Sequence, residues 1–198
     1  MIAVKVNEPI SPEVYLASER QSPVKREYVD GQVYAMAGTS KVHNLISGNL
    51  YLLIRNGLRG SSCQTFIADI KVRIEQGKRF FYPDLLVTCD PRDDSDLTYV
   101  DHPTVIIEVL SESTESFDRG KKFQCYRMIP QLQDYVLVSS QEYLIEVLHR
   151  VEGDRWLLSL YEGVDAIAAI DGLNLELSLA EIYAGLDLNS SLEARENP

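Results

Sequence analysis

One short segment limits the possible folds of this chain more than any other, namely residues 104–110 with the sequence TVIIEVL. The run is nearly continuous in apolar residues and has the length of a strand, which is typical of a strand buried on both faces of a sheet. Only Glu108 interrupts it. Because a buried carboxylate is costly without a partner, we expect Glu108 to face a cationic side chain or a metal ion.

A second carboxylate lies at the start of another apolar run, YPDLLV at residues 82–87, in which Asp84 follows a proline. If the two strands are neighbours in one sheet, Asp84 and Glu108 can converge on one point. Carboxylate pairs of this kind bind Mg²⁺ or Mn²⁺, ions that keep several water ligands and take only one or two carboxylates. The alternative is structural, with Asp84 capping a turn and Glu108 paired with an arginine.

The rest of the chain shows helical and strand patterns in alternation, as expected of an α/β domain. Capping serines, an Asp-Gly turn and a proline set several of the boundaries. The predicted elements are a helix at 11–20, a hairpin at 28–34, a helix at 40–58, a strand at 65–75 that turns at 76–78 into a strand at 80–88, an exposed loop at 90–101, a helix at 113–129, a strand at 135–138, an outer hairpin of 143–149 and 156–161, and a short helix at 179–183. We expect one domain over residues 1–187 and a disordered polar tail over residues 188–198.

The composition of the 198 residues, 45% hydrophobic and 25% charged, is that of a globular domain large enough to bury a core. The first residues lack the pattern of a signal peptide, and no apolar run is long enough to cross a membrane, so we expect a cytoplasmic protein. The three cysteines, Cys63, Cys89 and Cys125, are far apart and form no CxxC pair. This spacing predicts neither a structural zinc site nor a disulfide.

The net charge of −11 argues against a protein that binds nucleic acid through phosphate neutralisation alone. The charge is unevenly distributed, however. Residues 1–127 carry 16 Lys and Arg against 17 Asp and Glu, a net charge of −1, whereas residues 128–198 carry 3 against 13, a net charge of −10. Small basic clusters at Lys25-Arg26, Lys78-Arg79 and Arg119-Lys121-Lys122 could form a modest groove, which formation of a homodimer would double.

Several sequence blocks taken together resemble the Uma-two family of DUF820 type, whose members are abundant in cyanobacteria and look like restriction endonucleases of the PD-(D/E)xK class. The blocks are EYVDGQVYAMAGTSKVHNLI, YPDLLV, PTVIIEVLSESTESFDRGKKFQCYR and IPQLQDYVLV. The resemblance extends from about Pro12 to Leu186. It implies an α/β fold with a restriction-endonuclease-like core, in which helices flank a mixed central β-sheet, here with an additional outer β-hairpin. It also implies that Asp84 and Glu108 bind Mg²⁺ or Mn²⁺ and that DNA is the substrate.

The chain departs from the nuclease pattern at one position. The resemblance implies a lysine two residues after the second acid, where it would stabilise the charge that develops on the phosphate, but Leu110 stands there. The family's DxxxK element matches Asp118 and Lys122, four residues apart on one helical face. Lys122 could therefore reach back to the carboxylates and supply the cation. The alternative is that it pairs with Asp118 on a solvated face.

Two further residues match acidic or basic positions of the family. Glu27 could complete the metal shell or hold a water molecule of that shell, or it could be the solvent-facing start of a strand. His43 could shuttle a proton or contact phosphate, or it could be a structural histidine. The Asp69-Ile70-Lys71 segment imitates the end of the nuclease signature, but no PD precedes it, and we expect it to be a neighbour of Asp84 in the sheet.

The sequence therefore favours a Mg²⁺-dependent endonuclease that hydrolyses phosphodiester bonds of DNA, with Asp84, Glu108, Lys122, Glu27 and His43 as its catalytic residues. Two other functions are open. The first is a catalytically silent binding or regulatory module on the same scaffold, and the second is a hydrolase of small phosphate esters, which needs no basic groove.

Overall fold

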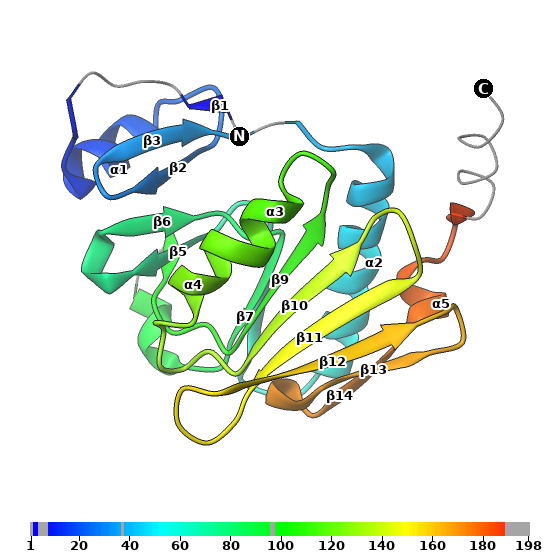
Figure 1. Cartoon of the computed structure of the whole chain (residues 1–198). Coiled ribbons are helices and arrows are strands. Elements are labelled where there is room, and N and C mark those ends of the chain that lie inside the picture. Colours follow the sequence, from blue (N-terminus) through cyan, green and yellow to red (C-terminus); the bar gives the residue numbers. More distant parts are fainter. Residues whose placement is uncertain (1, 4–7, 37, 96–97, 189–198) are drawn as a thin grey trace, which may run out of the picture.

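The fold is given by a computed structural model of the whole chain, in which residues 2–3, 8–36, 38–95 and 98–188 are described (Figure 1). The predicted disordered tail lies almost wholly outside these residues. No helix in the described part is long and apolar enough to cross a membrane.

A mixed six-stranded sheet forms the centre of the protein, with the strand order β12-β11-β10-β9-β7-β4. The β9 and β10 strands are parallel, and the other neighbours are antiparallel. The strands are β4 (Gln64–Ile67), β7 (Leu85–Thr88), β9 (Val105–Leu110), β10 (Asp134–Ser139), β11 (Leu144–Arg150) and β12 (Trp156–Glu162). Helices flank both faces, with α2 (Lys41–Gly57) on one side and the segment that contains α3 (Glu115–Phe117) and α4 (Phe123–Tyr126) on the other (Figure 1). The predicted fold class and the outer β11–β12 hairpin are confirmed.

A second six-stranded sheet, with the order β1-β3-β2-β6-β5-β8, packs beside the first. Its strands are β1 (Ile2–Ala3), β2 (Arg26–Val29), β3 (Gln32–Ala35), β5 (Lys71–Ile74), β6 (Arg79–Phe81) and β8 (Tyr99–Val100). The helix α1 (Pro12–Glu19) covers it through Tyr15, whose hydroxyl donates to the carbonyl of Arg26 at 2.6 Å. The predicted hairpin is the β2–β3 pair, and its turn residues Asp30 and Gly31 both have positive φ, as an Asp-Gly hairpin turn requires.

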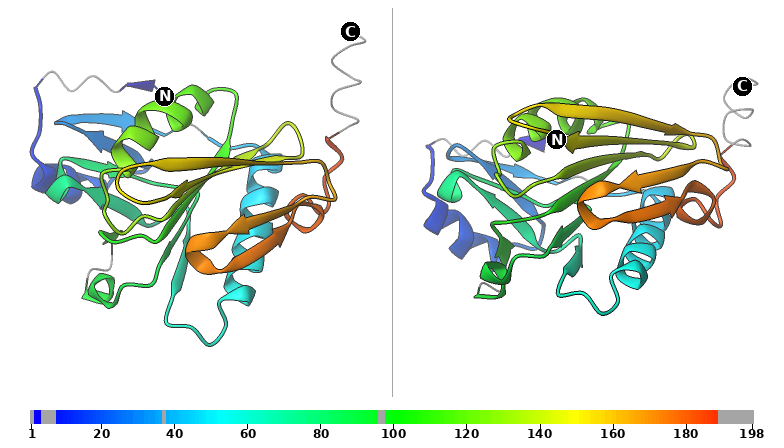
Figure 2. Two further views of the ribbon diagram at one scale, coloured as in Figure 1. Left: turned by 60° about the horizontal axis from the view of Figure 1, so that its bottom comes forward. Right: turned by 90° about the horizontal axis from the view of Figure 1, so that it is seen from below.

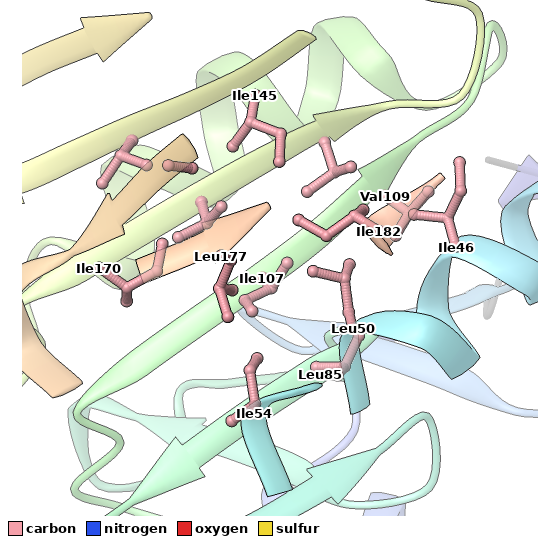
Figure 3. Close-up of a cluster of buried hydrophobic side chains, with 14 of the residues drawn as sticks. Ile46, Leu50, Ile54, Leu85, Ile107, Val109, Ile145, Ile170, Leu177 and Ile182 are labelled. Carbon is pink, nitrogen blue, oxygen red and sulfur yellow. The ribbon is translucent and has the colours of Figure 1, made fainter. Parts of the chain in front are cut away.

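The main core lies between the central sheet and α2 (Lys41–Gly57). Residues at helical spacing on α2, namely Ile46, Leu50 and Ile54, meet alternate residues of β9 such as Ile107 (Figure 3). A hairpin that the sequence analysis did not predict, β13 (Ile167–Ile170) with β14 (Leu175–Ser178), closes this core together with α5 (Leu179–Ile182). Figure 2 shows this hairpin beside α2, on the same face of the sheet.

The strand predicted at residues 65–75 is divided into β4 and β5, which belong to different sheets. The chain leaves the extended conformation at Ala68, where φ is +60°, and the N–H of Ala68 donates to the carbonyl of Asp84 at 2.9 Å. The partner run is divided in the same way into β6 and β7. The prediction of one hairpin is therefore wrong, although its turn, with Gly77 at a φ of +98°, is placed correctly.

The helix predicted at residues 113–129 contains an unusual turn. It consists of α3 (Glu115–Phe117), a π-helical segment (Asp118–Lys122) and α4 (Phe123–Tyr126), and it ends before Pro130 as expected. The loop predicted at residues 90–101 contains a 3₁₀ turn (Pro91–Ser95) and the short strand β8, and its residues 96–97 lie outside the described part.

A disulfide joins Cys63 and Cys89, contrary to the prediction that the chain forms none. The two cysteines flank paired positions of β4 and β7, because Gln64 lies opposite Thr88 in the sheet. Their Cα atoms are therefore only 4.1 Å apart despite a separation of 26 residues in the sequence. The third cysteine, Cys125, is buried and free.

Candidate functional site

Asp84 is held by both the strand β9 and the helix α2. It directly precedes β7, and its Oδ2 accepts the backbone N–H of Val109 at 2.7 Å. The Nε2 atom of His43, near the start of α2, lies 3.1 Å from the same oxygen. Since Leu85 pairs with Ile107, the next step along the two strands brings Asp84 opposite Glu108. The two carboxylates predicted to converge therefore do lie side by side, Glu108 within β9 and Asp84 at the start of the neighbouring β7.

Glu108 is almost fully buried, with 3% of its surface exposed. Its Oε1 accepts hydrogen bonds from Lys122 Nζ at 2.9 Å and from the hydroxyl of Tyr126 at 3.1 Å. Burial raises the pKa of Glu108 well above its ordinary value; the positive charge of Lys122 lowers it, and the negative charges of Asp118 and Asp84 raise it further. A second cation close to Glu108 would stabilise its charged form.

Lys122 is the cation at the centre of the site. Its Nζ atom lies 2.9 Å from Glu108, 3.2 Å from Asp118 and 3.4 Å from Glu27, so that one ammonium group faces three carboxylates. Burial lowers the pKa of Lys122, but the charges of Glu108 and Glu27 outweigh burial, and the pKa lies well above its ordinary value. Lys122 does pair with Asp118, but it is buried and not on a solvated face.

The π-helical segment places Asp118 and Lys122 on the side of the helix that faces β9. A π turn leaves backbone groups outside the α-helical pattern, and such turns often occur at functional sites. The carbonyl of Asp118 accepts a hydrogen bond from the hydroxyl of Tyr135 at 3.0 Å. Tyr135 on β10 therefore supports the turn that presents the lysine.

Glu27 enters the site from the second sheet. It is 2% exposed on β2, and its Oε1 accepts the backbone N–H of Tyr82 at 3.3 Å in addition to its contact with Lys122. Burial raises the pKa of Glu27, and the nearby Lys122 opposes the shift. The interpretation of Glu27 as the solvent-facing start of a strand is therefore wrong.

Leu110, which stands at the position of the nuclease lysine, is part of the core. It is 4% exposed and packs in the apolar cluster on the α4 side of the sheet, together with Tyr126 and Ile129. A lysine there would bury its charge among apolar side chains. The cation of this site comes from the helix.

Two residues contact the site that the sequence analysis did not single out. Tyr126 binds Glu108 directly, and Tyr82 holds Glu27 through its backbone. The signal for Tyr126 is its spacing of four residues from Lys122, which places both on one helical face. The Asp69-Ile70-Lys71 segment borders the site without lining the pocket. It follows Ala68, whose N–H donates to the carbonyl of Asp84, and Asp69 pairs with Lys25 at 2.5 Å, while Lys71 donates to the hydroxyl of Tyr82 at 3.2 Å.

The site residues line a pocket of about 910 Å³. Glu27, His43, Asp84, Glu108 and Lys122 all contribute to its wall, and so do the hydroxyl side chains that follow β9, Ser111, Ser113 and Thr114. The volume is in the range of pockets that bind small molecules or a segment of a larger ligand.

The donor set of this pocket fits a Mg²⁺-type ion held by two carboxylates. In the described part of the chain, no three His, Cys, Asp or Glu side chains converge on one metal position. Asp84 and Glu108 each use one carboxylate oxygen for the contacts given above, and the second oxygen makes no hydrogen bond to a described residue. Two carboxylates with water in the remaining positions are a common way for proteins to bind Mg²⁺.

A mixed sheet flanked by helices, with carboxylates on two adjacent strands and a lysine close to them, defines a protein of the restriction-endonuclease-like class. The chain belongs to the Uma2 family, whose model, described as "Putative restriction endonuclease", matches residues 12–181. The resemblance found in the sequence is thus confirmed. Restriction-endonuclease-like proteins generally use divalent metal ions.

Two relatives come from the cyanobacterium Synechocystis sp. The uncharacterized protein slr1290 is 41% identical over 177 residues, which cover 89% of this chain and 93% of the relative. The uncharacterized protein sll1609 is 33% identical over 168 residues, which cover 84% and 95%.

The crystal structure of a putative nuclease belonging to DUF820 from Anabaena variabilis shares the fold. Its TM-score is 0.71 at 17% sequence identity, over 89% of this chain and 98% of that one.

Proposed function

We propose that the protein is a divalent-metal-dependent endonuclease that hydrolyses phosphodiester bonds of DNA, with Mg²⁺ or Mn²⁺ as the ion. The observation that carries this proposal is the position of Lys122, whose Nζ lies 2.9 Å from Glu108 in a pocket that Asp84 also lines. Membership of a family of restriction-endonuclease type supports it.

Each residue has a distinct task in this proposal. Asp84 and Glu108 would hold the ion, which supplies Lewis-acid polarisation of the phosphate and activation of water. His43 and the N–H of Val109 fix the orientation of Asp84. Lys122 stabilises the negative charge that develops on the phosphate during attack. Glu27 and Asp118 hold the ammonium group of Lys122 in place.

The basic residues near the site support weak binding of DNA. Lys25 lines the pocket but pairs with Asp69, Arg26 pairs with Glu19, and Arg119 pairs with Glu115 and Glu146. Paired arginines contribute less to phosphate binding, and affinity that depends on few phosphate contacts falls only moderately with salt. Binding is therefore expected to be weak, and cleavage is a better measure of function than affinity.

The test is cleavage of plasmid and single-stranded DNA in Mg²⁺ or Mn²⁺, compared with the same reaction in a chelator. Asp84→Asn and Glu108→Gln are each expected to lower the cleavage rate by at least about 100-fold. Asp165→Asn is the matched control, because Asp165 is exposed and does not line the pocket. Cleavage that persists in both site variants would refute the assignment.

Leu110 favours a second candidate, a catalytically silent module that binds a partner. In that case the metal would neither support cleavage nor raise the melting temperature, because no ion would bind the folded state. A metal-dependent rise in melting temperature that Asp84→Asn abolishes would support the metal site even before a substrate is found.

A further inference from the structure

Exposed apolar side chains gather around the strand β12. Five of the ten large hydrophobic residues that are exposed in the described part of the chain lie within residues 157–167. They are Leu157, Leu158, Leu160, Val164 and Ile167. A concentration of this kind on a soluble fold marks an interaction surface.

The strand β12 is also the edge of the central sheet (Figure 1). Val151 donates to the carbonyl of Arg155 at 2.9 Å, and Gly163 donates to the carbonyl of Tyr143 at 2.9 Å. Both bonds join residues that lie opposite each other just beyond the ends of the β11–β12 pair, and hydrogen-bonded pairs recur at every second residue of an antiparallel ladder. The odd-numbered residues of β12 therefore direct their backbone groups towards β11, and the even-numbered residues direct theirs outwards. In the described part of the chain, no strand pairs with this outer side.

The sequence of β12, WLLSLYE, lacks the features that usually protect an edge strand. It contains no lysine and no proline, the residues that most often prevent pairing with another chain. It is also seven residues long, so that it presents several unpaired backbone groups. These features favour addition of another strand.

The strand is complementary to a second copy of itself. Antiparallel pairing about a two-fold axis at Ser159 would place Leu158 of one copy opposite Leu160 of the other, and Leu157 opposite Tyr161. The even-numbered residues, whose backbone groups point outwards, would make the hydrogen bonds. The end with Arg155 would also meet the end with Glu162, so that opposite charges lie close together. A two-fold interface requires this kind of self-complementarity.

We propose that two copies of the chain associate through antiparallel pairing of their β12 strands, centred on Ser159, to form one continuous sheet across the dimer. The pairing leaves the nuclease pocket unchanged, because no residue of β12 lines it. It is therefore independent of the proposed function, and cleavage per chain is expected to be the same in the dimer and in the monomer.

The first test measures molar mass by light scattering and sedimentation equilibrium over a range of concentrations. The unchanged protein is expected to be a dimer. Leu158→Lys or Leu160→Glu alone is expected to raise the dimer dissociation constant by at least about tenfold, since each places a charge opposite leucine. The two substitutions in one chain are expected to restore the dimer, because lysine and glutamate then face each other across the axis. Leu52→Lys, at an exposed leucine of α2, is the control that stays dimeric.

The second test uses Ser159→Cys. At this position the two copies would form a non-hydrogen-bonded pair with Cα atoms about 4.5 Å apart, a distance suited to a disulfide. Oxidation is expected to give a covalent dimer on a non-reducing gel, which the unchanged protein does not form. A monomer at all concentrations, or a dimer that both single leucine substitutions leave intact, would overturn the proposal, as would a Ser159→Cys protein that does not cross-link.

Discussion

Asp84 Oδ2 accepts the backbone N–H of Val109, the residue directly after Glu108, at 2.7 Å. The main chain of β9 therefore fixes one carboxylate of the site and carries the other. The separation of Asp84 and Glu108 is set by the pairing of β7 with β9, and the chain does not need a metal ion to bring them together. Because the site is formed before a ligand binds, less binding free energy is lost in ordering the protein around that ligand.

His43 is expected to act by orienting Asp84. His43→Ala should lower the cleavage rate or the metal affinity by about 10- to 100-fold, the usual effect of removing a partner that orients a metal ligand. The measurement is cleavage rate against metal concentration. His43→Gln, which keeps a side-chain donor, should recover part of the loss. An unchanged metal dependence in His43→Ala would show that the contact at 3.1 Å has no such role.

Lys122→Met is expected to abolish cleavage and to lower the free energy of unfolding by about 3 to 5 kcal/mol, because three buried carboxylates lose their cation. Urea unfolding measures the stability, and the plasmid assay measures the activity. Lys121→Met is the matched control, since the neighbouring lysine is exposed. Equal effects of the two substitutions would contradict the central position of Lys122.

The pH dependence of stability should report the burial of Glu108, whose pKa lies well above its ordinary value of 4.5, mainly because of burial. At a pH below 4.5 the folded and unfolded chains both bind the proton. As the pH rises towards the pKa in the folded state, the unfolded chain releases its proton first, and stability is lost.

Glu108→Gln has no such proton. Its free energy of unfolding, minus that of the unchanged protein, should therefore increase with pH above about 4.5 in the presence of a chelator. Urea unfolding at several pH values measures the difference. Glu112→Gln is the control, because it removes a charge from an exposed glutamate close to Glu108. If the difference for Glu108→Gln did not change with pH, the pKa of the Glu108 carboxyl would not be raised in the folded protein.

Reduction of the disulfide between Cys63 and Cys89 should lower the stability by about 3 kcal/mol, as expected for a loop of 26 residues. A dithiol reductant should therefore lower the melting temperature. The double variant Cys63→Ser, Cys89→Ser should start from the lower value and no longer respond. Cys125→Ser should still respond to the reductant, and a response that persists in the double variant would contradict the pairing.

The central strand and its carboxylate could be predicted from sequence because both depend on local patterns. An apolar run identifies β9, and the cost of burying Glu108 predicts a cation nearby, which Lys122 supplies. Long-range pairings could not be predicted in this way. The disulfide depends on the register of β4 with β7, and the register is not visible in cysteine spacing.

Glu27 shows a second limit. It is buried against Tyr82 and Lys122, residues 55 and 95 positions away in the sequence, and no local pattern predicts such long-range contacts. Only the family resemblance placed Glu27 among the site residues. The π-helical turn is similar, since Asp118 and Lys122 are spaced equally well for an ordinary helix.

The π-helical turn places Lys122 independently of Asp84 and Glu108, which belong to the central sheet. A π turn holds more residues than an α turn, and each residue of an α-helix rotates the next by about 100°. A relative with one residue fewer at Gly120 would retain PD and the buried glutamate, but its helical acid and lysine would be three residues apart instead of four. The two strand carboxylates would therefore not indicate by themselves whether such a relative can cleave, because the cation comes from a separate element of the chain.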